Sequence, residues 1–410
     1  MTVSEQQFLS ILKTSVHPEL SCVIESPDWT GIMNTAQKQN LFPLIFDASQ
    51  RLPGYERIEA QYFASVAAQV SQQAQKTADF LQLYNAFLAD GLSPIVLKGI
   101  ICRSLYGDRA DFRPSGDEDI LVSKDDYAEA IRVLNNCGYT TDEKPDKDLD
   151  LVQEVTFKSP ESPLTIELHL NPFGTENNIR SSMNEWFRNV FDSQETLLIE
   201  NVPIRTLEQT DHMLFLIFHA FKHFIRGGFG IRLMLDTLLF AEKYFDCINW
   251  DYISRGLASV NATGFYDDLV ILGNKYLGFT LPEKETGTSP DELLDDMFHM
   301  GTFGNTNTAD RVAAVITADV VQKVSDRNKV DCSKSSKLCS MFRGLFPSWQ
   351  TWISKKPYLK DKPWMLPVEW VKRLVHFLRG QTDMSSMKEI GGGCEIADRR
   401  IELLKKYKVL

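Results

Sequence analysis

The sequence predicts an α+β fold in which a strand-containing core lies between an N-terminal and a C-terminal helical region. Residues 1–90 and 209–410 are predicted to be helical, whereas residues 91–208 hold short apolar runs bounded by turn-forming residues. A chain of 410 residues is long enough for two or three domains. We therefore expect three parts with these boundaries.

The N-terminal part contains one especially clear helix. Between Glu56 and Asp90, apolar residues recur every three or four positions. Gly91 follows as a helix stop. This spacing predicts a long amphipathic helix that leads directly into the central part.

A short strand opens the central part. The apolar run Ile95–Leu97 ends at Lys98 and Gly99, and a helical segment over Ile100–Tyr106 follows. Glycine at a strand-to-helix turn lets a phosphate group approach the backbone, and N–H groups at the start of a helix can bind an anion. Lys98 either contacts this phosphate or is a surface charge.

Two aspartates stand at the start of the next apolar run. Asp117 and Asp119 follow the turn Pro114–Gly116 and precede Ile120–Val122. Side chains at i and i+2 on a strand point to the same side, so both carboxylates can reach one divalent cation. A second Asp-x-Asp pattern, at residues 146–150, lies in a polar segment, and we interpret it as a solvated turn. The strand context predicts a Mg²⁺ site at the first pair.

The central part also contains a predicted hairpin. Strands over Val152–Lys158 and Leu164–Leu170 flank a loop rich in Ser and Pro. In the second strand, Glu167 and His169 share a face opposite the apolar residues. Glu167 is either a third carboxylate that completes a two-metal site for displacement at phosphorus, or an acid on an exposed strand face.

Two helix boundaries are also predicted. Ser123, with Asp126 three residues further on, is typical of an N-cap, and this helix runs to Cys137 before Gly138. In the C-terminal part, three consecutive glycines at 391–393 predict a break between helices.

The C-terminal part offers a pair of histidines at a metal-ligand spacing. His219 and His223 lie one helical turn apart on the same face. No HExxH pattern and no nearby Cys accompany them, which argues against zinc. Together with Arg232 and Asp236, they either line a cleft or belong to the core. His169 is a further cleft candidate.

The central motifs resemble those of the DNA polymerase beta-like nucleotidyltransferase superfamily. More narrowly, the chain resembles the bacterial "uncharacterised nucleotidyltransferase" family. The matching residues are Leu97-Lys98-Gly99, Tyr106, Arg113, Gly116-Asp117-Glu118-Asp119-Ile120-Leu121-Val122, Gly138-Tyr139 and Leu168-His169. Similar later pieces are Leu216 to His223, Arg232, Asp236, Leu345-Phe346-Pro347-Ser348, and Leu366-Pro367 with the residues up to Arg373.

This resemblance implies a nucleotidyltransferase-type mixed sheet. It also implies transfer of a nucleoside monophosphate from ATP or another nucleoside triphosphate to a hydroxyl group of an acceptor. The expected catalytic and metal-binding acids, for Mg²⁺ or Mn²⁺, are Asp117, Asp119 and Glu167. The residues expected to bind the nucleotide are Lys98, Gly99, Arg113, Ser115 and Gly116. Arg113 either neutralises phosphate charge or pairs with a nearby acid.

One residue departs from the family pattern. The position between the two aspartates is usually apolar, and here it is Glu118. On a strand, Glu118 points to the face opposite the two aspartates. We therefore expect it to affect strand packing and not metal binding.

The amino-acid composition favours a globular protein. The apolar content of 43% and charged content of 24% are those of a globular chain, and no apolar run approaches the length of a membrane helix. The N-terminus carries no basic-then-apolar targeting signal, and the seven Cys are unclustered. We therefore expect free thiols and a cytoplasmic location.

A net charge of −11 makes a nucleic-acid partner unlikely. Basic residues gather only over Lys355–Arg379, where aromatic residues are interleaved with them. This stretch is either a membrane-surface or nucleic-acid patch or, as we favour, a solvated face whose aromatics pack inward. We expect the acceptor to be a small molecule, a glycan or a protein side chain.

Two rival functions deserve comparison. A sugar-nucleotide glycosyltransferase also uses Asp-x-Asp to hold a metal diphosphate, but there the apolar strand usually precedes the pair, and here it follows. A catalytically inactive regulatory module of the same fold is the second rival. The intact acids Asp117, Asp119 and Glu167 argue against it.

Overall fold

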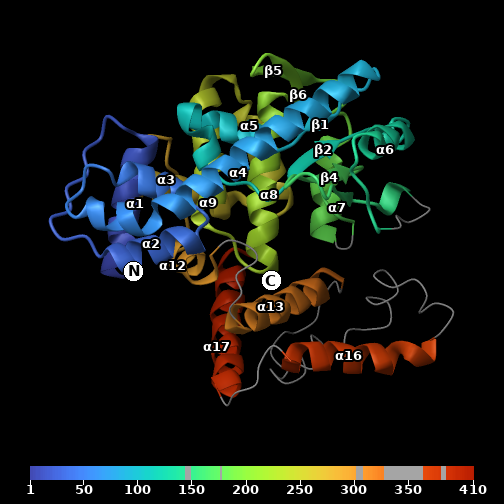
Figure 1. Cartoon of the computed structure of the whole chain (residues 1–410). Helices are drawn as coiled ribbons and strands as arrows, with labels where there is room; N and C mark the ends of the chain where they lie inside the picture. Colours follow the sequence, from blue (N-terminus) through green and yellow to red (C-terminus); the bar gives the residue numbers. More distant parts are fainter. Residues whose placement is uncertain (144–148, 176–177, 302–307, 327–362, 380–384) are drawn as a thin grey trace. The chain divides into compact units, whose positions relative to one another are not determined.

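The computed structural model describes residues 1–143, 149–175, 178–301, 308–326, 363–379 and 385–410. The chain divides into two compact units. The first comprises Met1–Lys222 and Phe229–Thr302, and the second comprises His223–Gly228 and Phe303–Leu410. The first unit contains a mixed sheet with helices around it, which confirms the predicted α+β fold (Figure 1).

Six strands form this sheet in the order β3-β4-β2-β1-β6-β5. Their bounds are β1 Ile95–Val96, β2 Glu118–Leu121, β3 Glu154–Lys158, β4 Thr165–His169, β5 Gln194–Ile199 and β6 Val202–Leu207. Strand β1 pairs antiparallel with β2 and parallel with β6, and β2 pairs parallel with β4. The sheet is therefore mixed, and the predicted hairpin is confirmed as β3 and β4.

The register between neighbouring strands brings charged residues together. Asp119 lies opposite Glu167 in the parallel pair of β2 and β4, and His169 is two residues further along β4. In the hairpin, Glu154 of β3 lies opposite His169. Because side chains alternate along each strand, these four residues share one face of the sheet.

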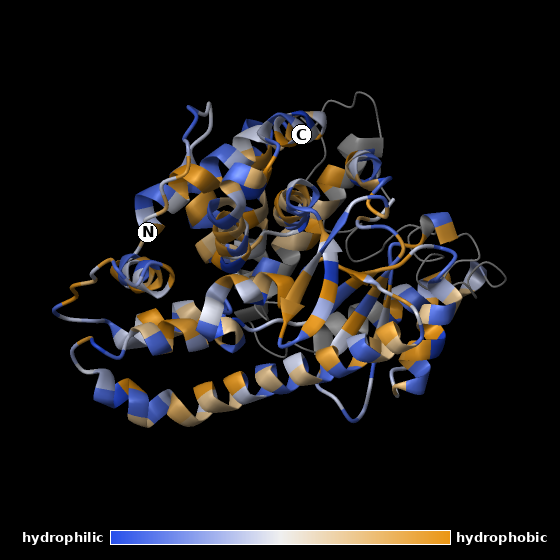
Figure 2. Cartoon of the chain, turned by 90° about the horizontal axis from the view of Figure 1, so that it is seen from above, coloured by the Kyte–Doolittle hydropathy of each residue, from blue (hydrophilic) through white to orange (hydrophobic). Residues whose placement is uncertain are grey.

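The opposite face of the sheet is apolar and is covered by two helices. These are α4 (Tyr55–Ala89) and α6 (Tyr127–Asn136). Their shared hydrophobic cluster includes Phe80, Tyr84, Phe87, Val96, Ile120, Ala130, Leu134, Ile166 and Leu168. Hydrophobic and hydrophilic residues alternate along α4, which gives this predicted helix its apolar face (Figure 2). Burial of this face is the main force that holds the sheet against the helices.

Three shorter helices precede α4: α1 Val3–Val16, α2 Trp29–Lys38 and α3 Phe42–Ala48. The Thr2 hydroxyl accepts a hydrogen bond from the N–H of Glu5, and the Glu5 carboxylate accepts one from the N–H of Thr2. This capping box satisfies donors that the first turn of α1 leaves unpaired. The helical character predicted for the N-terminal region is confirmed.

The first unit contains further helices along the chain. They are α5 Ile100–Arg103, α7 Asn178–Asn184, α8 Gln209–Arg226, α9 Ile231–Tyr244, α10 Trp250–Ser259, α11 Thr263–Leu272 and α12 Pro290–Met300, of which α8 ends in the second unit. Short helical turns are η1 Ser104–Phe112, η2 Leu149–Leu151, η3 Glu185–Phe187, η4 Phe245–Cys247 and η5 Gly273–Leu277. In the described part of the chain, no helix combines the length and the apolar character needed to cross a membrane.

The predicted helical segment Ile100–Tyr106 is confirmed. It is α-helical to Arg103 and continues as 3-10 turns, and Gly107, with a φ of 56°, interrupts the helical geometry directly after Tyr106. The start predicted for the following helix is wrong in detail. The next helix begins at Tyr127, since the Ser123 hydroxyl accepts the N–H of Asp126 in a turn that precedes the helix.

The second unit consists of helices in its described part. These are α13 Thr308–Asp326, α16 Leu366–Arg379 and α17 Ser385–Lys406, with the turn η8 Pro363–Met365. The predicted break at the three glycines is wrong, because α17 continues through residues 391–393. Ala397 of α17 packs with Ala313 and Ile316 of α13, and such packing outweighs the poor helix propensity of glycine.

The basic and aromatic stretch Lys355–Arg379 is described only from residue 363 onward, and the motif Leu345–Ser348 lies outside the described residues. Trp364 is 70% exposed and Val371 is 57% exposed. At Trp364, therefore, the expected inward packing of aromatic residues does not hold.

Candidate active site

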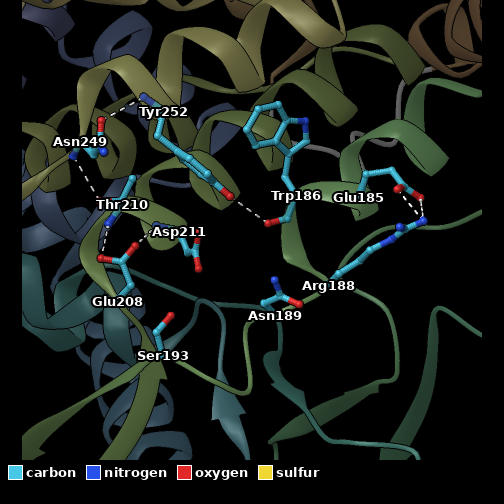
Figure 3. A pocket seen from close by; sticks show the side chains of 10 residues that line it. All are labelled: Glu185, Trp186, Arg188, Asn189, Ser193, Glu208, Thr210, Asp211, Asn249 and Tyr252. Atoms are coloured by element: carbon cyan, nitrogen blue, oxygen red, sulfur yellow. Dashed lines mark hydrogen bonds and ion pairs between the residues drawn. The ribbon is translucent and has the colours of Figure 1, made fainter.

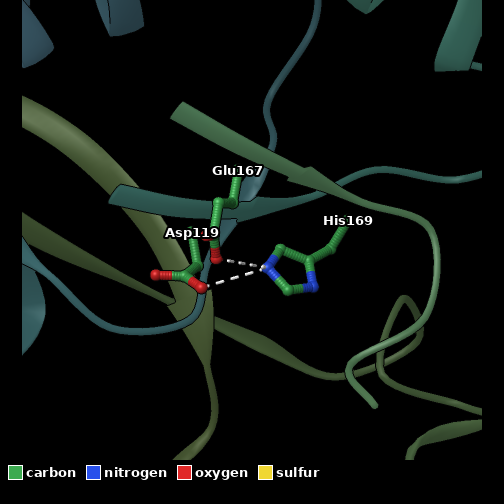
Figure 4. A group of neighbouring side chains, drawn as sticks. All are labelled: Asp119, Glu167 and His169. Atoms are coloured by element: carbon green, nitrogen blue, oxygen red, sulfur yellow. Dashed lines mark hydrogen bonds and ion pairs between the residues drawn. The ribbon is translucent and has the colours of Figure 1, made fainter. Parts of the chain in front are cut away.

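The acids that the sequence singles out meet at one face of the sheet. Asp117 precedes β2, Asp119 lies on β2, and Glu167 and His169 lie on β4. Figure 4 shows Asp119 and Glu167 pointing toward the imidazole of His169. The Nε2 atom of His169 is 3.0 Å from Asp119 Oδ1 and 3.8 Å from Glu167 Oε2. The strand register therefore produces a compact cluster from residues far apart in the sequence.

Lys98, at the end of β1, brings a positive charge into this cluster. Its Nζ atom lies 2.9 Å from Asp117 Oδ1 and 2.9 Å from Asp119 Oδ2. Burial opposes the ammonium charge, but Asp119 and Asp117 outweigh it and raise the pKa of Lys98. The two aspartates thus converge on one cation, and Lys98 is not a simple surface charge.

His169 is held in place at both ring nitrogens. Its Nδ1 atom lies 3.3 Å from the carbonyl oxygen of Asn171, so this nitrogen is the donor and Nε2 faces the acids. Burial disfavours the imidazolium, but the hydrogen bond to Asp119 and the nearby carboxylate of Glu167 outweigh burial and raise the pKa of His169 to about 10. Burial likewise opposes the charge of Asp119, yet Lys98 and His169 hold the pKa of this carboxyl well below its usual range.

The carboxyl group of Glu167 has a raised pKa. Burial, together with the charges of Asp119 and Asp117, raises its pKa to about 7, while the nearby imidazole of His169 acts in the opposite direction. The Asp119 side chain is 3% exposed, whereas those of Glu167 and Asp117 are 23% and 30% exposed. A ligand can therefore approach the cluster from the side of Glu167 and Asp117.

The cluster fits a divalent cation. Ligand atoms of Asp119, Glu167 and His169 all lie within 4.8 Å of one another. Mg²⁺ holds its ligands at about 2.1 Å, so opposite ligands are about 4.2 Å apart, and small side-chain shifts bring these atoms into range. Carboxylate oxygens suit Mg²⁺ and Mn²⁺, and an imidazole nitrogen is a ligand that transition metals accept more readily than Mg²⁺.

Glu118 points to the other face of the sheet, as its position on the strand predicts. Its carboxylate forms a buried ion pair with Arg103 and accepts a 2.8 Å hydrogen bond from the N–H of Ile100. A Cβ atom at Gly99, where φ is +64°, would lie 1.9 Å from Glu118 Oε2. Glycine at this turn therefore makes room for Glu118, and the N–H of Ile100 binds this internal carboxylate.

The turn before Asp117 is held by hydrogen bonds to Ser115. Ser115 donates its N–H to Gln73 Oε1 at 2.8 Å, and its hydroxyl accepts a hydrogen bond from Arg103 at 2.7 Å. Lys76 donates to the Ser115 carbonyl at 2.9 Å. Ser115 is buried, whereas Gly116 is exposed. These contacts give Ser115 a role in fixing the position of Asp117.

Arg113 pairs with an acid, which is one of its two predicted roles. Its guanidinium binds both carboxylate oxygens of Asp236 on α9, and Tyr106 donates a 2.8 Å hydrogen bond to the same carboxylate. Arg232 donates to the carbonyl of Pro114. Arg113 and Asp236 are 3% and 2% exposed, so this cluster ties α9 to the segment that precedes the aspartates.

The two histidines of α8 have different surroundings. His219 is 7% exposed and stacks on Phe215 with a ring-centre distance of 5.9 Å, as a core residue does. His223 is half-buried and belongs to the second unit. Neither joins the group of possible metal ligands found among the described residues.

Two charged residues near the cluster are absent from the sequence-based prediction. Glu154 Oε2 lies 3.5 Å from His169 Nε2, and counting back from the hairpin loop places Glu154 opposite His169. Lys222 of α8 is within electrostatic range of Glu154 and Asp119. The sequence offers only a weak signal for Lys222, namely its place between His219 and His223.

The first unit also contains a pocket of about 520 Å³ away from these acids, shown in Figure 3. Trp186 and Tyr252 form a T-shaped pair on its wall, with ring centres 4.9 Å apart. Asp211 lies beside them, and burial together with Glu208 raises its pKa to about 6. None of the residues predicted for the site lines this pocket.

Comparison with known proteins gives one match. A family model described as an uncharacterised nucleotidyltransferase matches residues 25–278. This range spans all six strands and every residue of the acid cluster. No curated protein and no solved structure matches the chain.

Proposed function

The chain belongs to the uncharacterised nucleotidyltransferase family, and on this premise we propose that it moves a nucleoside monophosphate from a nucleoside triphosphate to a hydroxyl group of an acceptor. The family confirms the resemblance seen in the motifs around Asp117 and Asp119. In the proposed reaction, the acceptor oxygen bonds to the α-phosphorus, the bond to the pyrophosphate oxygen breaks, and the hydroxyl proton is released.

The register of β2 and β4 is the observation that carries this proposal. It sets Glu167 opposite Asp119, with Asp117 on the same side and Lys98 between the two aspartates. Phosphoryl and nucleotidyl transfer need positioned charge more than covalent chemistry from the protein. A cluster of three acids with one lysine supplies such charge.

A divalent metal, Mg²⁺ or Mn²⁺, is part of the proposal. Asp117, Asp119 and Glu167 would hold it, with the Nε2 atom of His169 as a further possible ligand. When bound, the metal would neutralise phosphate charge and polarise the phosphoryl oxygens.

The chain's own residues have separate tasks in this proposal. Lys98 would bind phosphate oxygens once its aspartate partners hold the metal. Glu167 is partly exposed, so the acceptor hydroxyl can approach the metal that this carboxylate would hold. Glu118 and Ser115 would keep the turns that carry Lys98 and Asp117 in place, which is a positioning role.

The acceptor is proposed to be a small molecule, a glycan or a protein side chain. The net charge of −11 disfavours a nucleic acid, because phosphate backbones are bound by basic surfaces. A cytoplasmic location, proposed from the unclustered cysteines, agrees with the five described cysteines, which are free thiols.

Titration calorimetry tests this function directly. The full chain is titrated with each of the four ribonucleoside triphosphates and with UDP-sugars, with and without Mg²⁺ or Mn²⁺. We expect metal-dependent binding of a triphosphate that Asp119→Asn or Asp117→Asn weakens by at least about 100-fold, since even indirect partners of metal ligands contribute 10- to 100-fold.

Asp125→Asn is the matched control, because Asp125 is an exposed aspartate just beyond the same strand. It should bind like the natural chain. Binding of a UDP-sugar alone would instead support the glycosyltransferase. Undiminished triphosphate binding by Asp119→Asn would overturn the assignment of the site.

A further inference from the structure

Lys222 carries a positive charge that pairs with no residue the structure describes. Its half-buried side chain makes no hydrogen bond and no ion pair with any residue in the described part of the chain. Its Nζ atom stands 6.0 Å from the centre of the Phe173 ring, four residues after His169. A lysine in such surroundings is rare without a partner, because burial of an unpaired charge is unfavourable.

Lys222 interacts electrostatically with members of the acid cluster. Burial lowers its pKa to about 8, and Lys98 and Arg180 act in the same direction. Glu154 and Asp119 act in the opposite direction but do not restore the usual value. The ammonium of Lys222 therefore has nearby acids without a contact to either of them.

The other cations that approach the site already have partners. Lys98 pairs with the two aspartates, Arg103 with Glu118, and Arg113 with Asp236. Arg103 and Arg113 cannot leave their pairs without uncompensated buried carboxylates, and Lys98 becomes available only when a metal replaces it at the aspartates. Lys222 can bind an incoming anion without such a loss.

We propose that Lys222 binds the pyrophosphate part of the nucleoside triphosphate at this site. The inference rests on the proposed function, because it assumes that a triphosphate reaches the acids. Lys222 would neutralise the β- and γ-phosphates, while the metal and the aspartates hold the rest of the substrate. It would thereby discriminate triphosphates from monophosphates, and it would stabilise the leaving pyrophosphate through its charge.

Two measurements on the full-length Lys222→Met variant test this role. Methionine keeps the length and apolar stem of the side chain and removes the charge. Calorimetry with inorganic tripolyphosphate and Mg²⁺ needs no knowledge of the base, and we expect binding to weaken about 10- to 100-fold. Without ligand, the variant should melt at a higher temperature than the natural chain, because an unpaired and partly buried charge is lost.

If Lys222 served only to stabilise the fold, the Lys222→Met variant would melt at a lower temperature than the natural chain. Lys243→Met is the matched control, since Lys243 is exposed and also stands over an aromatic ring, 5.2 Å from the centre of Tyr244. It should change neither measurement. Lys222→Arg keeps the charge and should retain most of the tripolyphosphate affinity.

The outcomes separate this inference from the function on which it rests. Normal tripolyphosphate binding by Lys222→Met, or a lowered melting temperature, overturns the role of Lys222 and leaves the nucleotidyltransferase proposal standing. If the natural chain itself binds neither tripolyphosphate nor any nucleoside triphosphate with metal, both proposals are overturned.

Discussion

His212 of α8 is a buried histidine whose surroundings keep it neutral. It is 1% exposed, its Nδ1 atom lies 3.2 Å from the Thr206 hydroxyl, and its ring contacts Phe240 at a centre distance of 4.8 Å. Thr206 donates its own proton to the Val96 carbonyl, so Nδ1 of His212 is the donor. Burial lowers the pKa of His212 to about 4.

This residue predicts how stability depends on pH. The unfolded chain takes up a proton at His212 near pH 6.5, whereas the folded chain does so only near pH 4, so stability is full above pH 6.5 and falls as pH decreases toward 4. The His212→Asn variant keeps a side-chain donor and does not titrate. Between pH 7 and 4.5, its free energy of unfolding should fall by about 2–3 kcal/mol less than that of the natural chain.

Urea unfolding at several pH values measures this difference. His299→Asn serves as the control, because His299 is exposed on α12 and should leave the pH profile unchanged. Identical profiles for His212→Asn and the natural chain would show that His212 is not held neutral.

At the scale of single residues, strand periodicity is a good predictor of direction. It places Asp117, Asp119 and Glu167 on one face and Glu118 on the other, and the structure has this arrangement. Strand periodicity does not indicate which residues form ion pairs with one another. The pairing of Arg113 with Asp236 and the isolation of Lys222 depend on helices that approach from elsewhere in the chain, which no local pattern contains.

At the scale of elements, the turn between β1 and α5 is shaped by the strand beside it. Gly99 and Gly107 adopt nearly the same backbone conformation, with φ and ψ of 64° and −113° for Gly99 and 56° and −129° for Gly107. A Cβ at Gly99 would collide with Glu118, whereas a Cβ at Gly107 would have no atom within 4 Å. A side chain at either glycine would strain the backbone, but only a side chain at Gly99 would also clash with a neighbouring residue.

Replacement of each glycine by alanine gives a matched pair of variants. Gly107→Ala should destabilise the protein by about 1–3 kcal/mol through backbone strain alone. Gly99→Ala should cost about 1–3 kcal/mol more, because Glu118 must move, and it should weaken triphosphate binding. Urea unfolding and calorimetry measure both effects. Equal losses of stability would mean that the carboxylate of Glu118 adapts freely.

Helix boundaries were less predictable than helices themselves. The long α4 and the helix α6 follow apolar spacing, which tertiary packing reinforces. Serine is a favoured N-cap residue, yet the Ser123 hydroxyl accepts the N–H of Asp126 in a turn that precedes the helix. The glycines of α17 weaken the helix locally, but its contact with α13 depends on residues over seventy positions away, which propensity does not register.

At the scale of the whole molecule, the first unit is joined by contacts between distant segments. Gln39 is fully buried; its side chain donates to the Met297 carbonyl at 2.9 Å and accepts the N–H of Ile231 at 2.8 Å. Helical spacing alone does not reveal that helices α9 to α12 belong to the same compact unit as the sheet. Such membership depends on side chains like Gln39, whose partners are remote in sequence.

The first unit should therefore fold and bind its ligand by itself. A chain that ends at Thr302, with Phe224→Ser because this ring loses its contact with Tyr407, keeps the sheet and every residue of the acid cluster. We expect a cooperative thermal transition and metal-dependent triphosphate binding within about threefold of the full chain. The same truncated chain with Asp119→Asn should not bind, and loss of binding in the truncated chain alone would assign the second unit a part in the site.

The parallel pairing of β2 with β4 has a kinetic consequence. The β3–β4 hairpin joins neighbouring segments, whereas the pairing of Asp119 with Glu167 is non-local, and non-local pairing forms slowly. The proposed metal would thus find its complete ligand set only in the finished fold. By binding only the native state, the ion would slow unfolding and leave the rate of folding almost unchanged. It would therefore stabilise the completed structure without helping to nucleate it.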